Sequence, residues 1–197
     1  MLIQNEHHYR EVYHELQGLV DLILDLPQEL RGTTMVEIGS YTGDSTLVFS
    51  TFFGHVVSVD PHIYVNGKDL SDKWTPADVK KKYLENINNR SITYINKRSE
   101  KAVADVLKLL PSGCNFIYID GGHAYEQVIK DIAAYWPLVM YGGVLAGHDY
   151  DCKDLPGVKK AVDELFGAPD KEYIDGSWLI YKTIERKLNH GQAESAI

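Results

Sequence analysis

The 197-residue chain has few cysteines, no run of basic residues and no long apolar segment. Its two cysteines, Cys114 and Cys152, form neither a disulfide framework nor a zinc-binding pattern. With 20 basic against 28 acidic residues and a formal charge of −8, it lacks the basic surface that a nucleic acid requires. No apolar run is long enough to span a bilayer, and the first residues do not resemble a signal peptide. We therefore expect one cytoplasmic domain over residues 1–197 that binds neither nucleic acid nor a membrane.

A glycine-containing stretch near residue 40 is the main candidate binding site. Apolar and β-branched residues at 33–38 predict a buried parallel strand, and residues 44–46 predict the cap of a helix. Gly39 and Gly43 predict a sharp turn between them. Free N–H groups at a helix start attract a carboxylate or phosphate, whereas Glu37 at the strand end suits an ammonium group. Together these features favour a zwitterion such as S-adenosylmethionine.

A dinucleotide site is the first alternative for this turn. Its fingerprint is G-x-G-x-x-G, which lets the backbone touch a pyrophosphate. Here Tyr41 takes the place of the second glycine, which speaks against a nicotinamide cofactor. A turn that only packs a helix on a strand is the structural alternative.

The rest of the chain alternates between predicted strands and helices. Strands are expected at 56–60, 92–95, 115–120 and 143–146, and helices at 77–87, 101–110, 125–135 and 156–166. Residues 171–174 and 178–182 predict a hairpin around Asp175-Gly176. The pattern predicts an α/β, Rossmann-like, doubly wound sheet of seven mostly parallel strands that ends in an antiparallel hairpin.

The ends and one long loop are less regular. Residues 1–28 are expected to hold an N-terminal helix that packs beside the sheet or against a partner subunit, and residues 186–197 a flexible tail. Residues 62–75 form either a lid or a surface insertion. Three histidines near the N-terminus are expected to be solvated: His7, His8 and His14.

Two further motifs complete a recognisable series. Asp120-Gly-Gly-His-Ala-Tyr125 follows the fourth predicted strand, and His148-Asp149 follows the fifth. With the glycine turn and the terminal hairpin, the chain resembles a class I S-adenosylmethionine-dependent methyltransferase over nearly its full length. The two later motifs look like those of small bacterial and phage-type methyltransferases. The first motif is similar to that of catechol O-methyltransferase.

The resemblance implies a role in donor binding for nine residues. The donor's amino group would face Glu37, its methionine part Gly39, Ser40, Tyr41 and Gly43, its carboxylate Ser45, its ribose Asp60 and its adenine Ser99, with Asp120 beside the donor. The position of Asp60, about twenty residues beyond the turn, independently suits an acid that holds ribose hydroxyls.

The resemblance also implies catalytic and metal-binding residues. Catechol-type enzymes hold Mg²⁺ where this chain has Asp120, His148 and Asp149, and the histidine would suit Mn²⁺, Fe²⁺ or Zn²⁺ better. His123 takes the place of a lysine general base, and we expect its imidazole to be neutral near pH 7. Hydrogen bonding to a loop is the alternative for both histidines, and capping of the helix that begins near Tyr125 is a further one for His123. Convergence of two histidines and two aspartates on adjacent strand tips favours a functional role. Tyr125 and Trp136 are expected in the core.

The predicted reaction is O-methylation of a small molecule. No Asn-Pro-Pro-Tyr motif follows the fourth strand, so amino-group methylation of DNA or glutamine is not expected. A hydroxyl group of a small-molecule acceptor is the expected target. An NAD-dependent oxidoreductase and a non-catalytic donor-binding protein are the alternatives.

Overall fold

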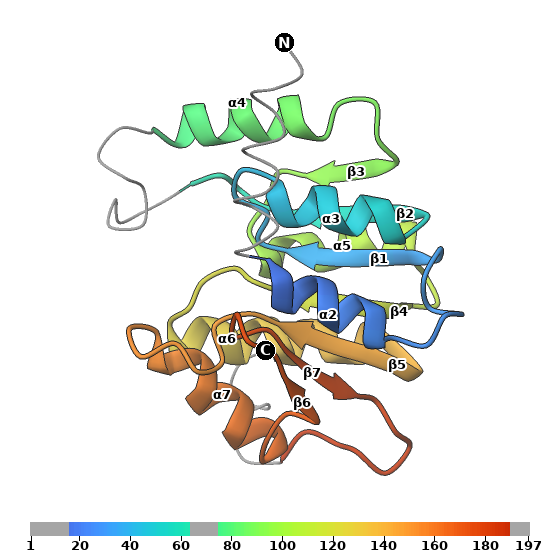
Figure 1. Ribbon diagram of the computed structural model, residues 1–197, viewed down its shortest axis with the longest axis vertical. Helices are drawn as coiled ribbons and strands as arrows, with labels where there is room; N and C mark the ends of the chain where they lie inside the picture. The colour runs from blue at the N-terminus through green and yellow to red at the C-terminus, as the bar shows by residue number, and fades with distance from the viewer. Residues whose placement is uncertain (1–15, 64–74, 190–197) are drawn as a thin grey trace.

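The computed structural model describes residues 16–63 and 75–189 (Figure 1). In these residues a seven-stranded sheet runs in the order β3-β2-β1-β4-β5-β7-β6. Its strands are β1 Thr34–Ile38, β2 His55–Val59, β3 Ile92–Ile95, β4 Cys114–Ile119, β5 Val139–Gly147, β6 Lys171–Glu172 and β7 Trp178–Tyr181. The first five strands pair in parallel, whereas β7 pairs antiparallel with both β5 and β6. The predicted fold class is confirmed.

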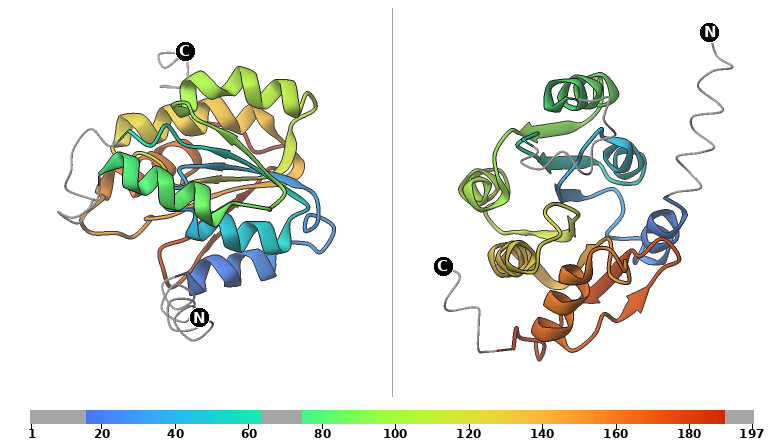
Figure 2. Two further views of the ribbon diagram at one scale, coloured as in Figure 1. Left: turned by 90° about the horizontal axis from the view of Figure 1, so that it is seen from above. Right: turned by 90° about the vertical axis from the view of Figure 1, so that its left-hand side faces the viewer.

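Helices cover both faces of this sheet (Figure 2). They are α2 Gln17–Asp25, α3 Asp44–Phe52, α4 Pro76–Asn86, α5 Ser99–Leu109, α6 Tyr125–Tyr135 and α7 Pro156–Phe166, with a 3₁₀ turn, η1, at Trp136–Leu138. One apolar core joins α5, α6 and α7 to the sheet, and a second joins α2 and α3 to the opposite face. None of the helices in the described ranges is long and apolar enough to cross a membrane.

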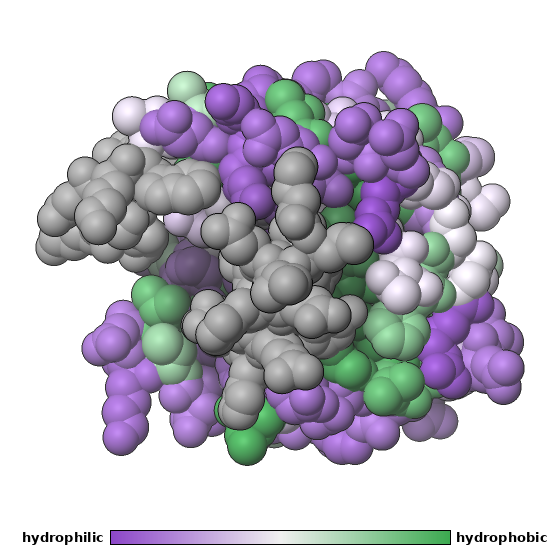
Figure 3. Space-filling view, turned by 45° about the horizontal axis from the view of Figure 1, so that its top comes forward, coloured by the Kyte–Doolittle hydropathy of each residue, from purple (hydrophilic) through white to green (hydrophobic). Residues whose placement is uncertain are grey.

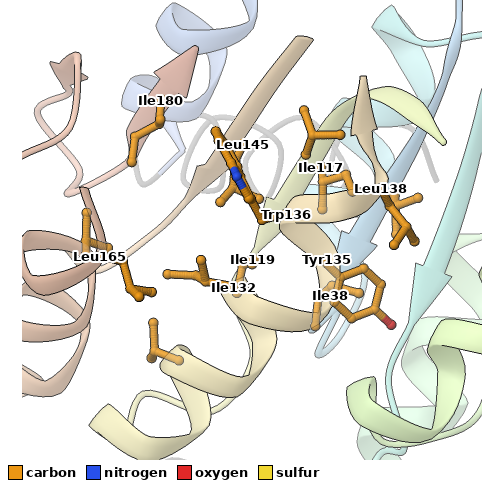
Figure 4. Close-up of a cluster of buried hydrophobic side chains, with 14 of the residues drawn as sticks. Ile38, Ile117, Ile119, Ile132, Tyr135, Trp136, Leu138, Leu145, Leu165 and Ile180 are labelled. Carbon is orange, nitrogen blue, oxygen red and sulfur yellow. The ribbon is translucent and has the colours of Figure 1, made fainter. Parts of the chain in front are cut away.

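Alternation along the strands divides the apolar side chains between the two cores. Val36 and Ile38 of β1 belong to the α5–α7 core, whereas Met35 belongs to the α2–α3 core. Figure 4 shows Ile38 of β1 and Ile132 of α6 among the side chains of the α5–α7 core. Because both faces are covered, the parallel strands read as nearly continuous apolar runs. Trp136 lies in this core as predicted, with 6% of its surface exposed.

Several predicted boundaries differ from the structure. β5 begins at Val139 rather than Gly143, because its pairing with β4 shifts register and so includes residues that do not alternate cleanly. In the predicted flexible tail, Arg186 contacts Asp170, and the side-chain amide of Asn189 donates to Glu164 O at 2.8 Å. The N-terminal histidines and the first half of the N-terminal helix fall on residues 1–15, outside the described residues. Most of the segment 62–75, expected as a lid or a surface insertion, falls on residues 64–74, which are also outside them.

The hairpin between β6 and β7 binds the start of α2. This helix has no side-chain cap of its own, since Leu16 stands at its N-cap. Asp175, at the hairpin turn, accepts the Leu19 N–H at 2.7 Å and the Ser177 N–H at 2.9 Å. A carboxylate at a helix N-terminus satisfies an unpaired N–H and interacts favourably with the helix dipole. The cap therefore comes from a residue 156 positions away.

We expect Asp175→Ala to lower the free energy of unfolding by about 1–2 kcal/mol, because the first turn of α2 loses its cap. Urea denaturation monitored by circular dichroism would measure this loss. Asp21→Ala is the matched control, since Asp21 is exposed and, within the described residues, accepts a hydrogen bond from Gln17 of the same helix alone. Equal losses in the two variants would contradict the cross-chain cap.

Candidate active site

A cleft of about 570 Å³ opens where the parallel strands β1, β2, β4 and β5 end. Its walls come from the turn after β1, Asp60 after β2, the start of α5 at Ser99, the segment 120–123 after β4, and Asp149 after β5. The face of the molecule seen in Figure 3 is mostly hydrophilic, with smaller hydrophobic patches. Sheets of this type bind ligands at the carboxyl ends of their strands. The cleft therefore lies where the topology predicts a ligand.

The turn after β1 is held by the carboxylate of Asp60. Asp60 Oδ2 accepts the N–H groups of Ser40 at 2.8 Å and Tyr41 at 3.0 Å, and Oδ1 accepts the His62 N–H at 2.6 Å. Gly39 has φ +85°, and a Cβ there would meet the Asp120 carbonyl oxygen at 2.1 Å. Only glycine permits this approach. The turn and the end of β4 are thus in direct contact.

Tyr41 lies in the left-handed region with φ +45°, where glycine would stand in a dinucleotide fingerprint. A residue other than glycine is strained there and needs its surroundings to hold it. His62 supplies part of this support, because its Nε2 donates to Tyr41 O at 2.8 Å. The other ring nitrogen of His62 bonds the Tyr94 hydroxyl at 2.7 Å. The side chain of Tyr41, 42% exposed, forms part of the cleft wall.

Glu37 lies beneath the turn rather than on the cleft wall. Its side chain is fully buried, and its two oxygens accept the hydroxyls of Ser45 at 2.6 Å and Thr46 at 2.5 Å. The sequence analysis expected residues 44–46 to cap α3, but these hydroxyls bind Glu37 instead. The N-cap is Gly43, with φ +88° and no side-chain cap. Burial raises the pKa of Glu37 to about 7, against the opposing effect of the two hydroxyls.

Side chains of the motifs after β4 and β5 contact one another in series. His123 Nε2 lies 3.1 Å from Asp149 Oδ2 and 3.6 Å from Asp120 Oδ1. On its other side, Asp149 Oδ1 lies 3.2 Å from His148 Nδ1. Asp149 itself has φ +62°, an uncommon conformation for this residue type. The predicted convergence of two histidines and two aspartates is therefore present.

The carboxylates decide the protonation of both histidines. Asp120 and then Asp149 raise the pKa of His123 to about 10, which outweighs its partial burial. Burial lowers the pKa of His148, but Asp149 and Asp120 more than offset this and bring it to about 9. Although burial disfavours its charge, Asp149 has a pKa well below the ordinary value because both imidazoles bond it. The expectation of a neutral His123 at pH 7 therefore does not fit the ligand-free site.

The three side chains that lie close enough together to hold a metal ion are not the three that were predicted. One ligand atom each from Asp120, His123 and Asp149 lies within 4.8 Å of the others. His148 is outside this group, and its buried Nε2 has no hydrogen-bond partner among the described residues. Two carboxylates and an imidazole are a donor set that suits Mn²⁺, Fe²⁺ or Zn²⁺. The site residues therefore fit a divalent cation, with His123 in place of His148.

Tyr125 and Tyr150, each two residues after a motif histidine, contact α7 and do not line the cleft. The hydroxyl of Tyr125 donates to Glu164 at 2.7 Å, and that of Tyr150 donates to Asp163 at 2.5 Å. The ammonium groups of Lys160 and Lys159 lie 4.0 Å and 3.9 Å from the same two rings. Two neighbouring pairs on one helix thus anchor the loops that carry His123 and Asp149.

The end of the cleft beside α5 contains a buried acid that the sequence analysis did not identify. Asp131 on α6 is 1% exposed and accepts from the Ser99 hydroxyl and from Gln127 Nε2, the latter at 2.9 Å. Burial raises the pKa of Asp131 to about 6. One signal was available: Asp131 is a charged residue beside the apolar stripe of α6.

Known proteins share this fold. A TDP-rhamnose 3′-O-methyltransferase of calicheamicin biosynthesis superposes with a TM-score of 0.58 at 16% identity, covering 89% of this chain and 80% of its own. The O-methyltransferase NovP superposes with a TM-score of 0.56 at 18% identity, and the match covers 88% of this chain and 79% of NovP. An O-methyltransferase of Bacillus cereus in complex with S-adenosylhomocysteine gives 0.51 at 16% identity, covering 85% and 88%. The fold is that of the class I S-adenosylmethionine-dependent methyltransferases.

Sequence similarity identifies the family. A methyltransferase-domain family matches residues 36–150, more than half of the chain, and the chain belongs to it. An uncharacterized protein of Acanthamoeba polyphaga mimivirus is 28% identical over 158 residues. That match spans 78% of this chain and 66% of the viral protein. Family membership decides against the nicotinamide-dependent alternative.

Glu37 should make stability fall as the pH rises. Its folded pKa of about 7 lies above the ordinary value of 4.5, so the folded state binds more protons than the unfolded state between these values. We expect its contribution to be fully present below pH 4.5 and to decline by about 3 kcal/mol as the pH approaches 7. In Glu37→Gln, whose amide does not ionise, urea denaturation between pH 4.5 and 8 should lack this decline. The same slope in both proteins would contradict the assignment.

Proposed function

We propose that this protein transfers a methyl group from S-adenosylmethionine to a hydroxyl oxygen of a small-molecule acceptor. The observation that carries the proposal is one cleft that joins the turn at Gly39 to the cluster around His123. A methyl transfer needs little covalent participation by the enzyme, but it needs the two reactants held in line. The named functions of structural neighbours, among them a sugar 3′-O-methyltransferase, support an oxygen acceptor. We further propose that residues 1–197 act as a single cytoplasmic domain.

In this proposal the donor's methionine part lies against the turn. Gly39 and Tyr41 of this turn line the cleft. The N–H groups of Gly39, Ser40, Tyr41 and Gly43 already donate within the protein, so side chains and backbone surface carry most of the contact with the donor. Ser45 donates its hydroxyl proton to Glu37, so its free lone pairs suit the donor's ammonium better than the carboxylate expected from the resemblance. Glu37 then acts through Ser45 as a buried acceptor. Asp60, 5% exposed on the cleft wall, is the proposed partner of the ribose.

His123 is the proposed general base, and the two aspartates are its partners. Asp149 at 3.1 Å orients the imidazole, as a carboxylate does for a catalytic histidine. The same carboxylates hold a proton on His123 in the ligand-free site, so the base becomes competent when that proton leaves. A divalent cation held by Asp120 and Asp149, with His123 as third ligand, is the second candidate arrangement, and it would acidify the acceptor hydroxyl as a Lewis acid. His148 holds the far oxygen of Asp149 in either arrangement.

A donor-binding protein without catalysis is the remaining alternative. It would bind S-adenosylhomocysteine but release none from S-adenosylmethionine with any acceptor. Incubation with a panel of phenols and sugars, with release of S-adenosylhomocysteine as the readout, separates the two functions. No turnover across the panel, with donor binding intact, would favour the binding protein.

Gly39→Ala should weaken binding of S-adenosylhomocysteine by at least about tenfold, because the new Cβ would push the end of β4 away from the turn. Isothermal titration calorimetry measures this affinity. The matched control is Gly142→Ala: Gly142 has φ +80°, close to that of Gly39, but nothing lies within 4 Å of a Cβ there. Equal affinities in the two variants would place the donor elsewhere.

The protonation of His123 should appear in the pH–rate profile. In the presence of a chelator, the acidic limb of kcat/KM for the donor, which reports the enzyme before the donor binds, should lie near pH 10, the pKa that Asp120 and Asp149 impose, rather than near 6.5. Asp149→Asn should move this limb down, because one of the two carboxylates that stabilise the imidazolium is gone. His123→Ala should remove the limb and lower kcat by roughly 10²–10⁴-fold with donor affinity nearly intact.

The same experiment distinguishes His123 as a general base from His123 as a ligand of a divalent cation. Complete loss of activity in the chelator, with recovery on adding Mn²⁺ or Zn²⁺, would favour the cation with His123 as its ligand. Full activity in the chelator, with an acidic limb that follows Asp149→Asn, would favour the base. A profile unchanged in His123→Ala would contradict both roles.

A further inference from the structure

Asp131 presents one oxygen to the cleft. Its Oδ1 takes two hydrogen bonds, from the Ser99 hydroxyl and from Gln127 Nε2. Its Oδ2 has no hydrogen-bond partner among the described residues, and a side chain built on Gly121 would come within 3.7 Å of it. Gly121 and Asp131 both line the cleft. A carboxylate that is 99% buried, with one acceptor oxygen left open toward a cleft, calls for a donor group on a ligand.

The position of Asp131 in the cleft indicates which part of the ligand carries that donor group. If the methionine part of the donor lies at the turn after β1, as the proposed function holds, the nucleoside extends toward α5 and α6. The lining residues there are Arg98, Ser99, Glu100, Gln127 and Asp131, and Gly121 and Gly122 also line the cleft. Gly121 adjoins Asp131, since a side chain built on it would come within 3.7 Å of Oδ2, and the absence of that side chain leaves Oδ2 accessible to a purine ring. A carboxylate oxygen accepts from an exocyclic amine but repels a carbonyl oxygen in the same place.

We propose that Asp131 is the residue that selects the nucleobase of the methyl donor, accepting a hydrogen bond from a 6-amino purine and excluding a 6-oxo purine. This inference rests on the proposed function, because it requires a nucleoside in the cleft. It adds a residue of α6 to the proposed donor-binding residues, which lie after the strands and at the start of α5. The two bonds at Oδ1 orient the carboxylate so that Oδ2, rather than Oδ1, meets the base.

Because the Asp131 carboxylate has a fixed orientation, one substitution should reverse which purine the protein prefers. In Asp131→Asn, the amide oxygen should take the place of Oδ1, because Ser99 and Gln127 donate to that position. The amide nitrogen then stands where Oδ2 stood and offers N–H to the base. The variant should therefore prefer a 6-oxo purine.

The experiment compares S-adenosylhomocysteine with S-inosylhomocysteine, its 6-oxo counterpart, by calorimetry. Wild-type protein should bind the adenine compound more tightly by roughly 100-fold, because the oxo compound leaves the buried acid unpaired and facing a like partial charge. Asp131→Asn should reverse the order of the two affinities. Glu126→Gln is the matched control: it makes the same charge change on an exposed residue of α6 outside the cleft wall, and should leave the ratio as in wild type.

Each outcome has one meaning. Equal wild-type affinities for the two compounds would overturn the role of Asp131, and this result does not depend on whether the variant folds. The same conclusion would follow if Asp131→Asn bound both compounds with the wild-type ratio. A ratio that moved in Glu100→Gln instead would transfer the selection to that exposed carboxylate on the same wall. Wild-type protein that bound neither compound would overturn the proposed function itself.

Discussion

The carboxylate of Asp60 is the interaction on which the donor side of the cleft depends. It gathers three backbone N–H groups from two loops, those of Ser40, Tyr41 and His62. Hydrogen bonds to a charged acceptor are the stronger kind, and they offset the strain of a tyrosine at φ +45°. The turn therefore keeps a shape that its residue types alone would not adopt. Because Asp60 is already so engaged, only part of its acceptor capacity remains for a ribose.

Asp149 plays the corresponding part after β5. Asp149 has a positive φ, as Tyr41 does. Its carboxylate contacts two imidazoles, whereas that of Asp60 accepts from backbone amides. The loops on either side are anchored to α7 through Tyr125 and Tyr150, so the cluster sits between fixed points. Preorganisation of this kind lets a site position reactants without paying for rearrangement during the reaction. In the proposed function, Asp60 belongs to the donor side of the cleft and Asp149 to the reacting side.

Local patterns in the sequence predicted the fold because strands, glycine turns and the final hairpin are encoded within a few neighbouring residues. They also predicted that His123, His148 and Asp149 would meet, since ends of adjacent parallel strands lie together. They did not predict the burial of Glu37 or its two hydroxyl partners, which depend on how α3 packs over β1. Nor did they predict the proton on His123, because its pKa depends on distances to two carboxylates from different loops. Asp131 was missed for a similar reason: its partner Ser99 is 32 residues away.

The charge of the proposed donor resolves the conflict between a base and its raised pKa. S-adenosylmethionine carries a positive sulfonium, whereas its product does not. A positive charge placed beside His123 disfavours the imidazolium, since like charges lower the pKa of a basic group. The two carboxylates then have a cation to interact with even after His123 has lost its proton. In the proposed function, donor binding and deprotonation of His123 therefore favour each other, and the acidic cluster that keeps His123 protonated before the donor binds would support the reaction in the complex.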